Sequence, residues 1–128
     1  MKNHIILLSA INGFIVVLLG AFGAHGLESI LSESALATWS TAVQYHMFHT
    51  LALFLVGNLM MHKQNSSLLK YSVTAFISGL LLFCGSLYLL ALTGISILGI
   101  ITPFGGLGFL AGWGLLAWQQ IINSRKTI

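Results

Sequence analysis

Four long apolar segments make up most of the chain. They cover residues 5–24, 42–61, 71–93 and 103–122, and none of them contains Asp, Glu, Lys or Arg. About 20 predominantly apolar residues in a helix cross the hydrocarbon core of a bilayer, which is about 30 Å thick. Lipid offers no hydrogen bonds, so each segment must satisfy its own backbone as a helix. The pattern predicts an all-α integral membrane four-helix bundle, formed as a single domain over residues 1–128.

Polar residues before two of these segments predict where the helices begin. Ser32 is a suitable N-cap, and the helix that follows is expected to run from about residue 33 through the second segment. At about 1.5 Å per residue it is roughly 43 Å long, so its first turns exceed the hydrocarbon thickness. Trp39 then falls at interface depth, where aromatic residues are common. Thr102 and Pro103 are expected as N-cap and first residue of the last helix.

Basic residues predict the orientation of the four spans. All five lie before the first span, between the second and third, or after the fourth: Lys2, Lys63, Lys70, Arg125 and Lys126. The other two connections contain no Lys or Arg, and the first of them holds the only acids, Glu28 and Glu33. The positive-inside rule therefore puts both termini in the cytoplasm. We expect a multi-pass protein of the plasma membrane, which is the inner membrane of a bacterium.

Composition excludes several other classes of protein. Hydrophobic residues make up 57% of the chain and charged residues only 5%, against about 25% charged residues in a typical soluble domain. Disorder requires the opposite balance of charge and hydrophobicity. The net charge of +3 comes from scattered residues and does not form the basic face that nucleic acid requires. The remaining partners are membrane lipid, other membrane proteins and further copies of this chain.

Small residues recur at a spacing that brings helix backbones together. Pairs four positions apart lie on one helix face and allow a neighbouring helix to approach closely. The pairs are Ser9 with Gly13, Thr74 with Ser78, and Gly108 with Gly112. They predict close packing of helices, either within one chain or between copies in a homo-oligomer.

Polar side chains within the spans gather toward one side of the membrane. Given the predicted orientation, nine of them fall in the outer half: His25, Gln44, Tyr45, His46, His49, Ser86, Tyr88, Thr93 and Thr102. Tyr45 and His49 are four residues apart and share the helix face that is expected to point inward. Asn12 and Asn58 fall nearer the cytoplasmic side and are candidate partners of one another.

Four interpretations of this polar set are open. Imidazoles from His25, His46 and His49 are suitable ligands for zinc, copper or haem iron. The set would instead line a proton or small-solute path in an oligomer, since histidines titrate near neutral pH. No nucleophile with a base at motif spacing and no phosphate-binding loop is present, so we expect neither an enzyme nor a resident metal or cofactor. The fourth interpretation is a structural network that sets which helix faces meet.

Blocks of sequence across the chain resemble a known family. They cover residues 20–27, 43–49, 85–93 and 101–107, which read GAFGAHGL, VQYHMFH, GSLYLLALT and ITPFGGL. The chain resembles the YgdD/YwdK-like family of small four-span membrane proteins, a domain-of-unknown-function family. The resemblance implies a plasma-membrane location and no established activity, substrate or catalytic residue. It also implies that Gln replaces His46 in some relatives and that Lys replaces Glu28 in many, which favours His25 and His49 as ligands.

Two functions follow from these observations. The first is an accessory or scaffold component that acts through lateral contacts in the membrane. The second is an oligomeric transporter or channel for a small solute or protons, built around the outer-half polar set.

Overall fold

The structure is a computed structural model that describes residues 2–62 and 66–125. The described residues are almost entirely helical. The elements are α1 (Lys2–His25), α2 (Glu33–His62), α3 (Ser67–Gly79), η1 (Leu80–Cys84), α4 (Gly85–Thr93) and α5 (Leu98–Arg125). Since α3, η1 and α4 follow one another without a break, they form one long helix with a short π-helical turn in its middle. The all-α fold expected from the sequence is confirmed.

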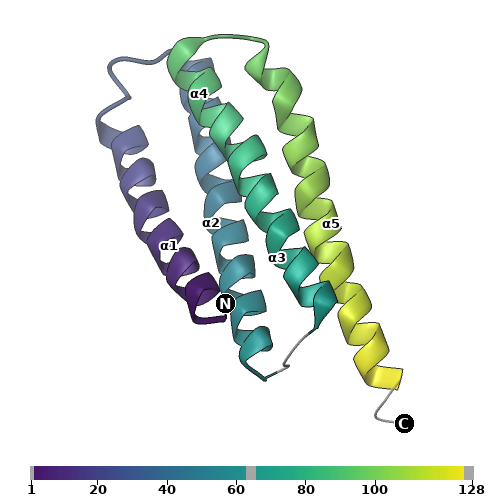
Figure 1. Cartoon of the computed structure of the whole chain (residues 1–128). Coiled ribbons are helices and arrows are strands. Elements are labelled where there is room, and N and C mark those ends of the chain that lie inside the picture. The colour runs from purple at the N-terminus through teal and green to yellow at the C-terminus, as the bar shows by residue number, and fades with distance from the viewer. Residues whose placement is uncertain (1, 63–65, 126–128) are drawn as a thin grey trace.

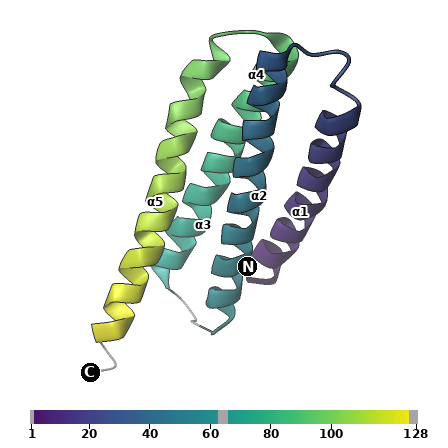
Figure 2. The same cartoon turned by 180° about the vertical axis from the view of Figure 1, so that it is seen from behind.

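The helices stand side by side in an up-and-down arrangement (Figure 1). α1 packs mainly on α2, α2 packs on the α3–α4 helix, and that helix packs on α5. Within the described residues, α1 and α5 have no extensive contact and lie at opposite sides of the bundle (Figure 2). The bundle is therefore not closed between α1 and α5. We call the end that carries residues 26–32 and 94–97 the upper end, as it is drawn in Figure 1.

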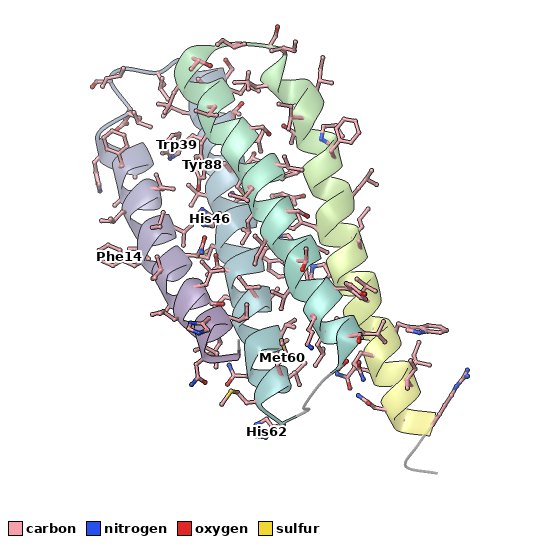
Figure 3. All side chains as sticks on the ribbon, in the orientation of Figure 1. Phe14, Trp39, His46, Met60, His62 and Tyr88 are labelled. Atoms are coloured by element: carbon pink, nitrogen blue, oxygen red, sulfur yellow. The ribbon has the colours of Figure 1, made fainter. Side chains whose placement is uncertain are left out.

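Three of the described helices are long and apolar enough to cross a membrane: Asn3–His25, Ser67–Thr93 and Leu98–Arg125. α2 is longer than any of them, but it is not in this set, since Gln44, His46, His49 and Asn58 lower its hydropathy. Large apolar side chains cover the outside of the bundle; Phe14, for example, is 67% exposed and points away from the other helices (Figure 3). Such a surface suits lipid rather than water.

Glycine contacts bring α5 very close to α3. A Cβ atom at Gly112 would lie 2.7 Å from the Phe76 ring, and one at Gly108 would lie 3.1 Å from the Ala75 carbonyl. Ser72 is fully buried between the two helices, and its hydroxyl donates to the Gly112 carbonyl over 2.8 Å. Gly108 and Gly112 thus serve packing within the chain. Such close approach strengthens dispersion contacts, which largely replace the hydrophobic effect between helices in lipid.

The two other small-residue pairs have different outcomes. Ser9 is buried against α2, and a Cβ at Gly13 would lie 4.0 Å from Thr50, so this pair does face a neighbouring helix. Ser78 contacts α5 at Gly108, but Thr74 is exposed and its hydroxyl donates to the carbonyl four residues earlier. The prediction that Thr74 packs between helices is therefore wrong within one chain, and its packing between copies stays a prediction. The serine two residues before it takes the buried position.

Helix starts also differ in part from expectation. α2 begins at Glu33, and the Ser32 hydroxyl accepts a hydrogen bond from the Ala35 amide over 3.2 Å, as an N-cap does. α5 begins at Leu98, so the expected start at Pro103 is wrong by five residues. Pro103 therefore stands inside α5, where it cannot donate a hydrogen bond to the carbonyl of Gly99.

Trp39 is buried within the bundle, and its position at interface depth stays a prediction. It is only 4% exposed, and its indole N–H donates to the Leu19 carbonyl of α1 over 2.9 Å. A buried indole N–H needs an acceptor, and the carbonyl in α1 provides one. Trp39 therefore joins α1 to α2 near the upper end of the bundle.

Candidate functional site

The nine predicted polar residues do not form one site. The structure divides them into a network around His46, an aromatic layer around His49, a hydroxyl pair between Ser86 and Thr102, and three residues outside these sets. The division follows from the helix itself, because positions three apart point about 60° away from each other. His46 faces α1 and α4, whereas His49 faces α5.

The His46 network joins three helices. The ring Nε2 of His46 lies 3.2 Å from the side-chain oxygen of Asn12 in α1, and Nδ1 lies 3.1 Å from the hydroxyl of Tyr88 in α4. The Asn12 amide nitrogen donates to the Leu8 carbonyl, so its oxygen is the acceptor. His46 Nε2–H therefore donates to Asn12, and Tyr88 O–H donates to Nδ1. A neutral histidine satisfies every bond in this network.

Aromatic contacts continue the network toward the upper end. Tyr88 lies edge-on to Trp39, with ring centroids 4.7 Å apart and an interplanar angle of 63°. Figure 3 shows Trp39, Tyr88 and His46 at successive levels between α1 and α4. These side chains fill the space between α1 and α4. The backbones of those two helices are not in extensive contact.

The His49 layer lies on another face of α2, toward α5. His49 stacks on Phe109 of α5, with ring centroids 3.5 Å apart and an interplanar angle of 9°. Its Nδ1–H donates to the Tyr45 carbonyl over 2.8 Å, and its Nε2 accepts the Trp113 indole N–H over 3.3 Å. Both ring nitrogens are again used by a neutral imidazole. The layer connects α2 to α5, although their backbones are not in extensive contact.

A groove of about 720 Å³ lies beside this layer, between α2 and α5. Figure 2 shows these two helices on either side of α3. The lining is mostly apolar and contains no charged residue: Gln44, Tyr45, Phe48, His49, Phe83, Pro103, Gly106, Leu107, Phe109, Leu110 and Trp113. We call this the α2–α5 groove.

The remaining predicted residues make no hydrogen bond to either His46 or His49. Ser86 and Thr102 form a hydroxyl–hydroxyl bond of 2.7 Å between α4 and α5. His25 and Thr93 are exposed at the upper ends of their helices, and Gln44 is exposed on α2 near Ser40. The structure therefore does not bring His25 to His46 or His49.

This arrangement limits what the histidines can do chemically. No group of three His, Cys, Asp or Glu side chains in the described part of the chain gathers at metal-binding distance. A metal at either buried histidine would have to displace a hydrogen bond that already holds the ring. Cys84, the last residue of η1, is buried, as a small apolar residue would be.

Sequence reasoning missed three members of these sets: Asn12 as the partner of His46, and Phe109 and Trp113 as partners of His49. The expected pairing of Asn12 with Asn58 is wrong, because the Asn58 amide donates to the Phe54 carbonyl of its own helix. The available signal for Asn12 was its position as the one amide in an otherwise apolar span. Nothing in the sequence pairs Trp113 with a histidine 64 positions away.

Comparison with known proteins identifies the family. A family model described as "Protein of unknown function (DUF423)" matches residues 19–106. The chain belongs to the DUF423 family. The resemblance to the YgdD/YwdK-like proteins is thereby confirmed, and the matched region includes Trp39, both buried histidines and Tyr88, whereas Asn12 and Trp113 fall outside it.

Individual relatives of this DUF423 protein cover nearly its whole length. It is 47% identical over 108 residues to UPF0382 membrane protein YwdK of Bacillus subtilis (strain 168), which covers 84% of this chain and 88% of the relative. It is 38% identical to UPF0382 inner membrane protein YgdD of Escherichia coli (strain K12) over 128 residues, 99% of this chain and 96% of the relative. A Haemophilus influenzae relative is 42% identical over 118 residues, covering 92% of this chain and 94% of the relative. No solved structure matches this chain. The protein is a membrane protein of a family whose function is not described.

Proposed function

We propose that this protein crosses the plasma membrane four times, with both termini in the cytoplasm, and acts as a non-enzymatic accessory or scaffold component through lateral contacts. The span added to the three long apolar helices is α2. It lies between α1 and the α3–α4 helix over their full length (Figure 1), so a bilayer crossed by its neighbours surrounds α2 as well. Its polar side chains explain its low hydropathy, and both histidines point at neighbouring helices.

The orientation rests on the basic residues. Lys70 and Arg125 lie toward the lower end of the bundle in Figure 1, opposite to the upper end that carries Glu28 and Glu33. Basic residues favour the cytoplasmic side. A reporter domain fused after Ile128 is expected to be active only as a cytoplasmic fusion. Activity of a periplasm-dependent reporter at that position would contradict the orientation.

One observation supports lateral contacts most strongly: the two buried histidines of α2 are held by partners within the chain. Both ring nitrogens of His46 and both of His49 have hydrogen-bond partners within the chain. The surface that remains is apolar and faces the bilayer. A protein built in this way presents its helix faces, rather than a polar site, to other molecules.

Site-specific photo-cross-linking in cells tests this proposal. A photoreactive residue at Phe14 or Leu81, which are exposed on α1 and η1, is expected to give discrete adducts with membrane proteins. The matched control is Phe76, which is fully buried and is expected to give none. Absence of protein adducts from every exposed position would contradict a scaffold role.

The alternative is an oligomeric transporter or channel. The observation in its favour is that Gln44, Tyr45 and His49 line the α2–α5 groove, which a second copy would have to close. His49→Phe separates the two functions. A channel would lose proton or solute flux in proteoliposomes while keeping its oligomer, whereas a scaffold is expected to show no flux in the wild-type protein and only lower stability in the variant.

A further inference from the structure

The α2–α5 groove opens sideways, and its dimensions indicate what fills it. On α5 the lining runs from Pro103 to Trp113, which is about 15 Å of helix at 1.5 Å per residue. The hydrocarbon core is about 30 Å thick, so this length corresponds to about one leaflet. Pro103 begins the apolar segment 103–122, and Gln44 and Tyr45 lie in the first turn of the segment 42–61. The groove therefore occupies the leaflet around the upper end.

A second transmembrane helix does not fit this groove well. Helix interfaces in membranes are rich in small residues. Only Gly106 is small among the lining residues, and most of the others carry large rings, such as Phe83 and Phe109. A flexible chain can follow such a surface more closely than a helix can.

The polar groups of the groove that lack a partner among the described residues lie at one end of its course along α2. The Tyr45 hydroxyl and the Gln44 side-chain oxygen have no hydrogen-bond partner among the described residues. Both residues lie close to the start of their apolar segment, which is the depth at which the ester groups of a phospholipid meet its chains. An unpaired hydroxyl in contact with hydrocarbon is unfavourable by several kcal/mol in general. An ester carbonyl at this depth would accept a hydrogen bond from Tyr45.

We propose that the α2–α5 groove is a binding site for one acyl chain of a phospholipid from the leaflet around the upper end, with its ester carbonyl at Tyr45 and its chain along the Phe83, Phe109 and Trp113 rings. No lining residue is charged, so the site recognises the chain and its ester rather than a headgroup. The proposal requires that the helices cross a bilayer, but it depends on neither the orientation nor a scaffold role.

Two glycines in α5 provide a matched pair of variants. A Cβ atom at Gly106 would lie 3.8 Å from the Phe83 ring, so Gly106→Leu fills the groove without a backbone clash. A Cβ atom at Gly114 would have no atom within 4 Å, so Gly114→Leu adds the same side chain to the same helix away from the groove. Leu107→Trp, at an exposed position on the groove, is a second filling variant if Gly106→Leu does not fold.

The test measures quenching of Trp113 fluorescence by a phosphatidylcholine brominated in its acyl chain. A Trp118→Phe background removes the lipid-exposed indole, and Trp39 is buried on the other side of α2. In mixed detergent micelles we expect quenching to saturate at a several-fold lower lipid fraction for the parent and Gly114→Leu than for Gly106→Leu. Tyr45→Phe is expected to weaken binding by about fivefold, the effect of one hydrogen bond.

Native mass spectrometry gives the second readout. One phospholipid per chain is expected on the parent and on Gly114→Leu, and none on Gly106→Leu. Equal quenching in the two leucine variants would overturn the proposal. So would a parent dimer that carries no lipid and that Gly106→Leu converts to a monomer, because a second copy would then be the occupant.

Discussion

Gly105 offers the sharpest test of how the helices pack. It is buried where α5 crosses η1, and a Cβ atom there would lie 2.7 Å from the Cα and Cβ atoms of Phe83 and closer still to its backbone nitrogen. A backbone atom cannot rotate away as a side chain does. Since ordinary contacts begin at 3.4 Å, Gly105→Ala would force α5 away from η1 by roughly 1 Å, a shift of the kind that overpacking produces.

The cost can be estimated against a control in the same helix. Glycine to alanine inside a helix favours folding by about 1 kcal/mol through propensity alone. Overpacking a close contact costs about 1–3 kcal/mol. Gly114→Ala has the first effect only, because its Cβ would have no atom within 4 Å. The two variants are therefore expected to differ by about 1–3 kcal/mol, with Gly105→Ala the less stable.

Reversible unfolding in a mild detergent, driven by sodium dodecyl sulfate and followed by tryptophan fluorescence, measures this difference. A separation of about 1.4 kcal/mol corresponds to a tenfold change in the unfolding equilibrium. The propensity effect cancels between the two variants, so the contact alone remains. Equal stability of Gly105→Ala and Gly114→Ala would refute the close approach of α5 to η1.

Three further predictions concern buried groups. Tyr88→Phe removes the donor to His46 and is expected to lower stability by about 0.6–1.7 kcal/mol in the same unfolding assay. A double-mutant cycle with His46→Phe should show coupling between the two positions. Strictly additive effects would contradict the network. Ser72→Ala is expected to lower stability by about 0.6 kcal/mol, whereas Thr74→Ala, at an exposed position, should leave it unchanged. Cys84, which is 2% exposed, should resist maleimide labelling in the folded protein and react after unfolding; rapid labelling without denaturant would show that it is not buried.

The helices themselves were predictable because their causes are local. An uncharged run of about 20 residues has to be helical in lipid. The Ser32 hydroxyl caps α2 through a bond to the Ala35 amide, three residues later, and this bond needs no other helix. The start of α5 was not predictable from local rules. Thr102 and Pro103 form a good helix-start signal, but the chain turns tightly at residues 95–97 and the helix begins there. The Thr102 hydroxyl then bonds Ser86 rather than capping the helix.

The π-helical turn of η1 could not be predicted from the sequence either. Residues 80–84 are Leu-Leu-Leu-Phe-Cys, an ordinary apolar run. Within it, the backbone of Phe83 lies so close to α5 that only a glycine fits at position 105. A feature that depends on a neighbouring helix more than 20 positions away leaves no periodic trace in the chain.

The sequence alone determined that this is an all-helical membrane protein. That conclusion depends on transfer of side chains and backbone from water to lipid, which composition and length describe. Only the tertiary structure decided that His46 and His49 belong to different sets, because a separation of three residues turns one ring toward α1 and α4 and the other toward α5. Which groups pair depends on helix rotation and contact, and those are set by packing between segments far apart in the chain.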